Sequence, residues 1–201
     1  MTDDSKNKVF IIANTLFDFE SRDCRKCSRS IGCWECEDRR KASKEIIKNW
    51  LKVVRDTDII WHLGNVLSDD VSYETIERVS KLPGIKFLIL GTRDREHDRE
   101  FWKRLRFHEV YDGEIEYGSK VILSTSPVNK FILKDRINIH GETKTHEGLS
   151  FGRYKYVGAE ILEFKPVLSV DLMIGGVGTN IDRKDVGFRE AGIEAKVVLT
   201  K

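Results

Sequence analysis

Three short apolar runs, each followed by a segment with one apolar face, constrain the fold of this chain most strongly. The runs are residues 9–13 (VFIIA), 58–63 (DIIWHL) and 85–90 (IKFLIL). Their β-branched residues and their length predict buried strands. The spacing of apolar residues predicts helices at 41–54, 71–82 and 97–105. A strand–helix alternation of this kind is typical of an α/β domain.

The second half of the chain has a different pattern. It predicts closely spaced strands at 108–124 and 136–140, another at 157–164, a helical or mixed piece at 168–174 and an edge strand at 196–200. We therefore expect an α/β fold in which two packed sheets form a β-sandwich flanked by helices. Residues 1–176 are predicted to form one domain, and residues 177–201 a tail that packs on it.

The composition limits the classes of function. The 35 Lys and Arg residues nearly balance 33 Asp and Glu residues, which argues against binding nucleic acid through bulk charge. The chain contains no Gln and is rich in Lys, Glu and Arg, as is typical of hyperthermophile proteins. The longest apolar runs are too short to span a membrane, and the N-terminus is polar. We expect a cytoplasmic protein with no membrane partner.

Ligands of open α/β sheets sit beyond the carboxyl ends of the strands, so the loops there matter most. In order, these loops read 13–17 (ANTLF), 62–66 (HLGNV), 90–94 (LGTRD), 123–127 (LSTSP) and 139–144 (IHGETK). Together they resemble the motifs of the calcineurin-like metallophosphoesterase superfamily, especially its small prokaryotic and phage members. The later segment 156–171 (YVGAEILEFKPVLSVD) is similar to the C-terminal part of that family. The resemblance covers residues 8–174 and implies a metallophosphoesterase-like fold.

The same resemblance implies that the two-metal site of the family is lost. The positions that correspond to its metal ligands and catalytic histidine are Asn14, Leu16, Asn65, Thr92, Arg93, Thr125, Glu142 and Lys144. Of these, only Glu142 is a good metal ligand, whereas two metals require several anionic oxygens and neutral imidazoles. Arg93 and Lys144 would place positive charge where the metals sit. We therefore expect no catalytic residues and no catalytic di-metal centre.

Two hypotheses describe what occupies the position of the lost metal ions. In the first, Arg93, Lys144 and Glu142 form an internal ion-pair network. In the second, Arg93 and Lys144 bind an anion such as phosphate together with backbone N–H groups.

Other residues near the motifs have alternative interpretations. A shifted alignment would instead give a working site built from Asp18, Asp94, His140, Glu142 and His146. Asp94 is also a candidate cap for the helix that follows it. His62 and His140 are interpreted as structural histidines.

All four cysteines lie in a polar segment, residues 20–40, that we interpret as an insertion. Cys24, Cys27, Cys33 and Cys36 form the pattern C-x2-C-x5-C-x2-C. Four thiolates satisfy a structural zinc site, which is our leading interpretation. Two disulfides or an iron–sulfur cluster remain alternatives. Basic residues and Trp34 surround the cysteines, so this segment is also a candidate contact for nucleic acid.

These features lead to one functional hypothesis and two alternatives. The leading one is a non-catalytic metallophosphoesterase-fold protein that acts as a protein-interaction or assembly module. Its partner would bind the former active-site face and the cysteine insertion. The first alternative is a nucleic-acid-associated protein that uses the basic cysteine segment. The second is a residual phosphoesterase with altered metal ligands.

The cysteine pattern gives a direct test. Elemental analysis of the purified protein is expected to find one zinc ion per chain and no manganese or iron, because four thiolates close a tetrahedral site. The Cys27→Ser variant should lose this zinc. Two further metal ions per chain would contradict the predicted loss of the di-metal centre.

Overall fold

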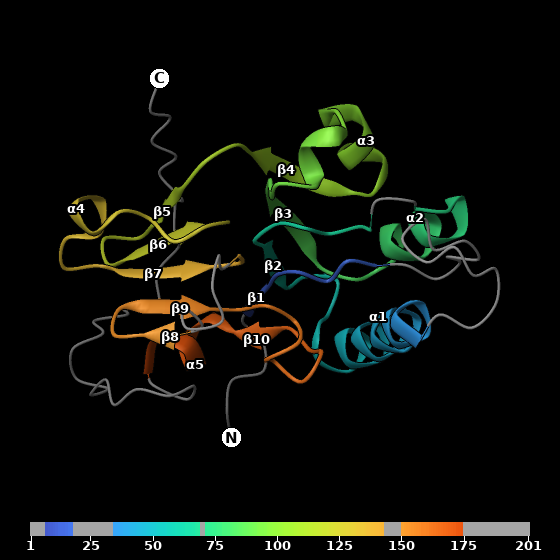
Figure 1. The fold of residues 1–201 in the computed structure, drawn as a ribbon, viewed down its shortest axis with the longest axis horizontal. Coiled ribbons are helices and arrows are strands. Elements are labelled where there is room, and N and C mark those ends of the chain that lie inside the picture. The colour runs from blue at the N-terminus through green and yellow to red at the C-terminus, as the bar shows by residue number, and fades with distance from the viewer. Residues whose placement is uncertain (1–6, 18–33, 69–70, 143–149, 175–201) are drawn as a thin grey trace.

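The fold consists of two mixed sheets flanked by helices, as the sequence predicts (Figure 1). The structure, a computed structural model, describes residues 7–17, 34–68, 71–142 and 150–174. The strand order of the first sheet is β10-β1-β2-β3-β4. Its strands are β1 (Val9–Ile12), β2 (Ile59–His62), β3 (Ile85–Ile89), β4 (Phe107–Tyr111) and β10 (Val167–Leu168). β1 to β4 are parallel, and β10 pairs with β1 in antiparallel orientation.

The second sheet has the strand order β5-β6-β7-β9-β8. Its strands are β5 (Ile115–Tyr117), β6 (Val121–Ser124), β7 (Ile137–His140), β8 (Ser150–Phe151) and β9 (Tyr154–Tyr156). The three central strands, β6, β7 and β9, are parallel, and the two edge strands are antiparallel to their neighbours. The carboxyl ends of β6 and β7 therefore meet at one edge of this sheet.

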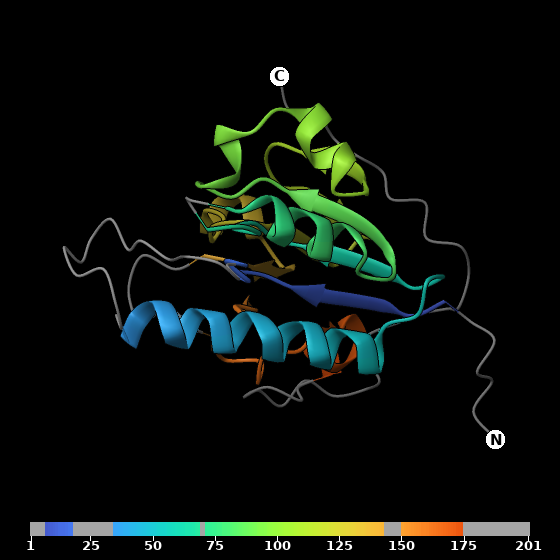
Figure 2. The ribbon, with the colours of Figure 1, turned by 90° about the vertical axis from the view of Figure 1, so that its right-hand side faces the viewer.

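Helices flank the two sheets. They are α1 (Trp34–Val53), α2 (Tyr73–Ser80), α3 (Arg99–Arg104), α4 (Lys130–Leu133) and α5 (Ser169–Ile174), with a short 3-10 turn, η1 (Asp94–Glu96). Figure 2 shows α1 and α2 on the same side of the molecule, α1 below α2. Within the described residues, no helix is long and apolar enough to cross a membrane.

The first three strands of the first sheet are mostly apolar because both of their faces are covered. In β1, Phe10 and Ile12 pack in the cluster that includes Ile46 and Trp50 of α1. Ile11 belongs to a second cluster, formed with side chains of the other sheet such as Leu123 and Ile139. Continuous apolar runs are expected for strands buried on both faces. This two-sided burial explains why the first three strands could be predicted from sequence.

Two sequence predictions about elements differ from the structure. The first helix begins at Trp34 rather than at residue 41, so the last part of the predicted 20–40 insertion, with the backbone of Cys36, is helical. The strand predicted at 157–164 was wrong. The chain leaves β9 after Tyr156, makes one bridge between Gly158 and Ala13, and then turns. Positive φ angles at Glu163 and Phe164 end any extended conformation there.

Lys86 is a buried lysine that the strand pattern of β3 does not anticipate. Only 2% of its surface is exposed. Its Nζ donates to the carbonyls of Val79, Ser80 and Leu82, with the shortest distance, 2.9 Å, to Leu82. These carbonyls lie at the C-terminal end of α2, where a cation is favourable. Lys86 therefore fixes the end of α2 to the sheet.

The pKa of Lys86 gives a prediction of pH-dependent stability. Burial, with a smaller contribution from Arg106, lowers this pKa from 10.5 to about 8. Between these values the unfolded chain binds more protons than the folded chain, so this residue makes the free energy of unfolding rise with pH. We expect that rise in wild type to be reduced in Lys86→Met but kept in Lys120→Met, an exposed control. Urea denaturation at pH 7.5 to 10 measures it, and equal slopes in all three proteins would contradict the assignment.

Candidate functional site

Five loops meet where the parallel strands of both sheets end. The registers place Ile12, His62 and Leu88 level with one another in the first sheet. In the second sheet Ser124 lies level with His140. The two edges touch at Gly141, where a Cβ atom would lie 2.0 Å from the carbonyl oxygen of Leu63. Only glycine allows this approach, which brings the loops after β2 and β7 together.

Asn65 is the centre of the hydrogen bonds that join these loops. Its Nδ2 donates to Asn14 Oδ1 at 2.9 Å and to Glu142 Oε1 at 2.7 Å. Its Oδ1 accepts from the backbone N–H of Arg93 at 3.2 Å. Both N–H donors of the amide are therefore used, and its orientation is defined by its neighbours. One side chain links the loops that follow β1, β2, β3 and β7.

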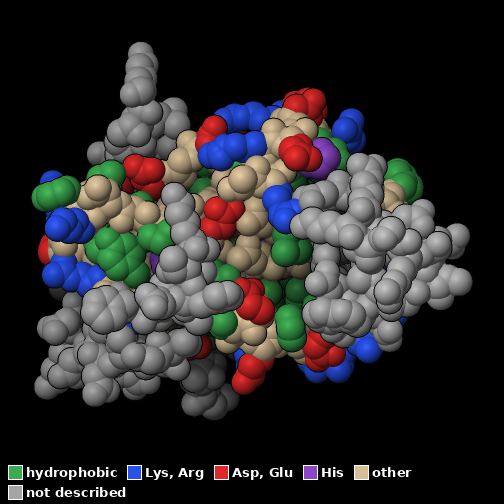
Figure 3. All heavy atoms as spheres, viewed as in Figure 1, with side chains coloured by type: hydrophobic (Ala, Val, Ile, Leu, Met, Phe, Trp, Pro, Cys, Tyr) green, Lys and Arg blue, Asp and Glu red, His purple; other side chains and the backbone are tan. Residues whose placement is uncertain are grey.

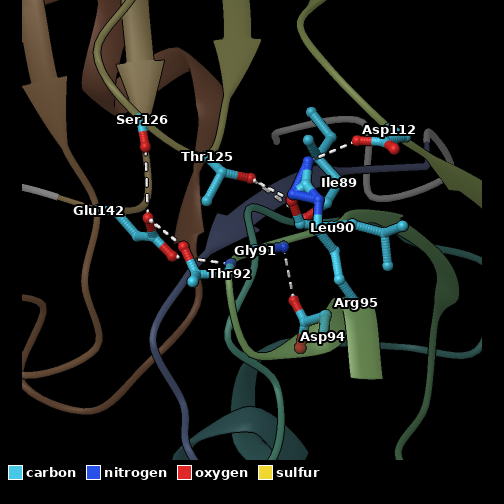
Figure 4. Close-up of polar contacts among 10 residues, drawn as sticks. All are labelled: Ile89, Leu90, Gly91, Thr92, Asp94, Arg95, Asp112, Thr125, Ser126 and Glu142. Carbon is cyan, nitrogen blue, oxygen red and sulfur yellow. Dashed lines mark hydrogen bonds and ion pairs between the residues drawn. The ribbon is translucent and has the colours of Figure 1, made fainter. Parts of the chain in front are cut away.

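The carboxylate of Glu142 accepts hydrogen bonds from neutral groups (Figure 4). Besides Asn65, Oε1 accepts from the backbone N–H of Thr92 at 3.1 Å. Oε2 accepts from Thr92 Oγ1 at 3.2 Å and from Ser126 Oγ at 3.3 Å. Four hydrogen-bond donors therefore contact Glu142, which is the one good metal ligand among the positions that correspond to the family's metal site.

The carboxylate of Asp94 fixes the backbone of two of the loops. Only 1% of its surface is exposed. Its carboxylate accepts from the backbone N–H groups of Asn65 at 2.6 Å, Val66 at 2.9 Å and Gly91 at 2.8 Å. Burial raises the pKa of Asp94, and the three backbone hydrogen bonds oppose that shift. The residue therefore joins the loops after β2 and β3, in place of the helix-cap role considered from the sequence.

The backbone of these loops is locally strained. Asn14, Leu16 and Asn65 have φ angles of 52°, 43° and 55°. Asn tolerates this left-handed region, whereas for Leu it costs on the order of 1 kcal/mol. Hydrogen bonds from Asn14 N to Gly64 O and from Leu16 N to Asn65 O hold the conformation. Strained residues of this kind cluster at functional sites, which supports a functional origin for the loops.

Two buried histidines each form one hydrogen bond to the loops through a ring nitrogen. Thr15 Oγ1 donates to the carbonyl of Val66, so it accepts from Nε2–H of His62 at 2.9 Å. His140 donates from Nδ1 to the carbonyl of Glu142 at 2.9 Å. Burial lowers the pKa of His62 to about 3 and lowers that of His140 as well. Both rings are therefore neutral at pH 7 and serve to position loops.

Tyr156 and Glu160 belong to the same network but were not recognised from the sequence. Asn14 Nδ2 donates to the hydroxyl of Tyr156 at 2.8 Å, and that hydroxyl donates to Glu160 Oε1. Burial, followed by the hydrogen bond to Glu160, raises the pKa of Tyr156. The sequence signal for both residues lies in the family-like segment 156–171, whose resemblance bears on the fold.

A pocket of about 330 Å³ opens beside Glu142. Its polar lining comes from Thr92, Arg95, Glu114, Ser126, Asn129 and Glu142. Arg95 pairs with Asp112 across one side of the pocket. In Figure 4 the carboxylate of Glu142 lies between Ser126 and Thr92, and Thr125 points toward the carbonyl of Leu90.

The structure brings most of the residues singled out from the sequence into these loops. Asn14, Asn65, Thr92, Arg93 and Glu142 are joined by hydrogen bonds. Lys144, Asp18, His146, Cys24, Cys27 and Cys33 lie outside the described residues. The ion-pair hypothesis stays a prediction, because Lys144 lies outside the described residues; the donors described on Glu142 are an amide, a backbone N–H and two hydroxyls. The anion hypothesis also stays a prediction.

Among the described residues, these loops offer few ligands for a two-metal centre. Such a centre needs several anionic or imidazole ligands directed at a common point. Asn65 uses both amide N–H groups within the protein, and Leu16 offers no donor atom. Within the described residues, no group of three His, Cys, Asp or Glu side chains is arranged to hold a metal ion.

Comparison with other proteins supports the fold alone. The sequence matches no family model. It is 29% identical over 182 residues to the uncharacterized protein MJ1445 of Methanocaldococcus jannaschii, covering 85% of this chain and 91% of that protein. The crystal structure of AQ665, a protein of unknown function from Aquifex aeolicus, is similar with a TM-score of 0.59 and 21% identity, covering 84% of this chain and 98% of that one. Both organisms are thermophiles, which agrees with the composition.

Replacing the central amide by a carboxylate tests the network. In Asn65→Asp a carboxylate would face Glu142 across 2.7 Å in place of an N–H donor. We expect the free energy of unfolding at pH 7 to fall by about 2 kcal/mol, because a hydrogen bond is replaced by like-charge repulsion. Urea denaturation measures this loss, which should shrink near pH 4 as the carboxylates take up protons.

Two variants serve as controls for this prediction. Asn129→Asp makes the same change at the exposed N-cap of α4, where a carboxylate also caps, so it should change stability by less than about 0.5 kcal/mol. The double variant Asn65→Asp, Glu142→Gln should recover part of the loss, because Gln can donate to the new carboxylate. Wild-type stability of Asn65→Asp at pH 7 would show that this contact does not hold the loops.

Proposed function

We propose that this protein is a non-catalytic member of the metallophosphoesterase-like fold and works as a protein-interaction or assembly module. The observation that carries the proposal is the hydrogen bond between Asn65 and Glu142. It joins the two residues that would have to bind metal and directs their polar atoms at each other. The loops are thereby fixed into one rigid surface.

The chemistry of hydrolysis supports the same proposal. In-line displacement at phosphorus relies on two cations that stabilise the attacking and leaving oxygens. A cation at this place would have to displace the N–H donors from Glu142 and would gain at most one neutral carbonyl oxygen from Asn65. The loss of these two N–H hydrogen bonds, each contributing roughly 1 kcal/mol, opposes such binding.

The surface beside the network has features of a protein interface. On α4, which borders the pocket, Phe131 is 76% exposed and Ile132 is 43% exposed. Large apolar side chains next to a polar rim are typical of protein-binding surfaces. We propose that a partner protein covers α4 and the pocket. The zinc-bound cysteine segment remains part of this proposal as a second contact.

The two alternative functions have less support. Figure 3 shows Lys and Arg side chains interspersed with Asp and Glu on the face that it presents, whereas nucleic-acid surfaces are basic bands or patches. The nucleic-acid hypothesis therefore depends on the cysteine segment, which lies outside the described residues apart from the start of α1. A residual phosphoesterase would need metal ligands that the described loops do not offer.

The proposal is tested by separating catalysis from binding. The purified protein is expected to leave bis(p-nitrophenyl) phosphate intact in the presence of manganese. The tagged protein should retain a specific partner from an extract of its host. Phe131→Asp should weaken that retention at least tenfold, because the charge would be buried in the interface. Val170→Asp, the same change at an exposed apolar residue of α5, is the matched control.

Two results would overturn the proposal. Manganese-dependent hydrolysis that Asn65→Ala abolishes would establish a working phosphoesterase. Equal partner retention by wild type, Phe131→Asp and Val170→Asp would show that α4 is not the binding surface.

A further inference from the structure

A second surface, which contains no residue of the five loops, lies between α1 and α2. The two helices lie on the same side of the molecule (Figure 2) and enclose a groove of about 610 Å³. Ile47 and Leu51 of α1 and Leu82 after α2 form its apolar floor. Leu51 is 58% exposed, whereas its neighbour Trp50 is buried in the core. The exposed leucine is therefore not needed to attach α1 to the sheet.

Cationic side chains form both rims of this groove. Lys44, Lys48 and Lys52 recur at four-residue spacing along α1, which places them in one row beside Ile47 and Leu51. Arg78 and Lys81 line the opposite rim. The groove thus combines an apolar floor with five cations, an arrangement that is complementary to a segment with one apolar face and acidic flanks.

The glutamates that pair with these cations do not cancel this complementarity. Lys48 pairs with Glu45 at 3.2 Å, Lys81 with Glu77 at 2.6 Å, and Arg78 with Glu74, each within its own helix. All six side chains are more than 40% exposed. Exposed pairs of this kind contribute little to stability, so a partner's carboxylates can replace them readily.

We propose that the groove between α1 and α2 binds an acidic amphipathic helix of a partner protein. The row from Lys44 to Lys52 is about 12 Å long at the rise of an α-helix, which matches two to three turns of a bound helix. Apolar residues of that helix at i, i+3, i+4 and i+7 would cover Leu51 and Ile47, as in other helix-in-groove complexes. Glutamates or aspartates on its flanks would face the two cationic rims.

The apolar floor favours a helix over a nucleic acid. A phosphate backbone would pair with the lysines but would leave Leu51 and Ile47 in water, because it offers no apolar surface. A second copy of this chain is also less complementary, since the opposing surface would carry the same cations. The proposal is independent of the one for α4, because the two surfaces are built from different helices.

Fluorescence anisotropy with a designed peptide tests this proposal on the full-length protein. The probe is an 18-residue labelled helix with leucines at i, i+3, i+4 and i+7 and glutamates on both flanks. It should bind saturably, whereas a scrambled peptide of the same composition and a peptide with lysine in place of glutamate should not. Leu51→Asp should weaken binding at least tenfold. Val53→Asp, the same change at an exposed residue of α1 outside the groove, should leave affinity within about twofold.

Charge reversal and competing ligands complete the test. Lys48→Glu should weaken binding of the acidic peptide several-fold, and Lys120→Glu, at an exposed lysine of the other sheet, should not. Thermal unfolding of each variant checks that the fold is kept. Equal binding of the scrambled peptide, or an unchanged affinity in Leu51→Asp, would overturn the proposal. So would tighter binding of a 20-nucleotide RNA, or a concentration-dependent dimer that Leu51→Asp dissociates.

Discussion

The hydrogen bonds of Asn65 are the interaction on which the arrangement of the loops depends. Three segments that are far apart in sequence present a polar group to this one amide, through Asn14, Arg93 and Glu142. Asp94 holds the same loop from below through the backbone N–H groups of Asn65 and Val66. Because a neutral amide both donates and accepts, it can join an acidic side chain and a backbone N–H at one point, which neither a carboxylate nor an ammonium group can do.

This arrangement explains how the loops keep a strained backbone. Positive φ angles at Leu16 and Asn65 persist only where neighbouring contacts determine the conformation. Here the contacts are hydrogen bonds within the protein together with the close approach of Gly141 to Leu63. The surface is therefore preorganised, and a partner that binds it need not supply the ordering free energy itself.

The strands that could be predicted from the sequence are those that are buried on both faces. The runs that became β1, β2 and β3 are apolar on both faces because each strand lies between a helix layer and the other sheet. The loop positions could be assigned because the loops follow the predicted strands and resemble family motifs; in the structure Gly64, Gly91 and Gly141 lie where backbones approach too closely for a side chain. The strand predicted at 157–164 failed because Gly158 pairs with Ala13 at one bridge only. The roles of Lys86, Asp94 and Tyr156 depend on contacts between distant segments, which a local pattern does not encode.

The charge distribution of the described residues separates two kinds of surface. Around Glu142 the polar groups are satisfied by one another, so a partner there gains mainly from apolar contact with Phe131 and Ile132. Between α1 and α2, Lys48 and Lys81 form exposed pairs that contribute little to stability, so a partner there gains from charge as well as from burying Leu51. Binding at α4 should therefore be nearly insensitive to salt, whereas binding between α1 and α2 should weaken as salt screens the rims. The two proposed surfaces therefore favour partners of different character, which is the property that the proposed assembly role requires.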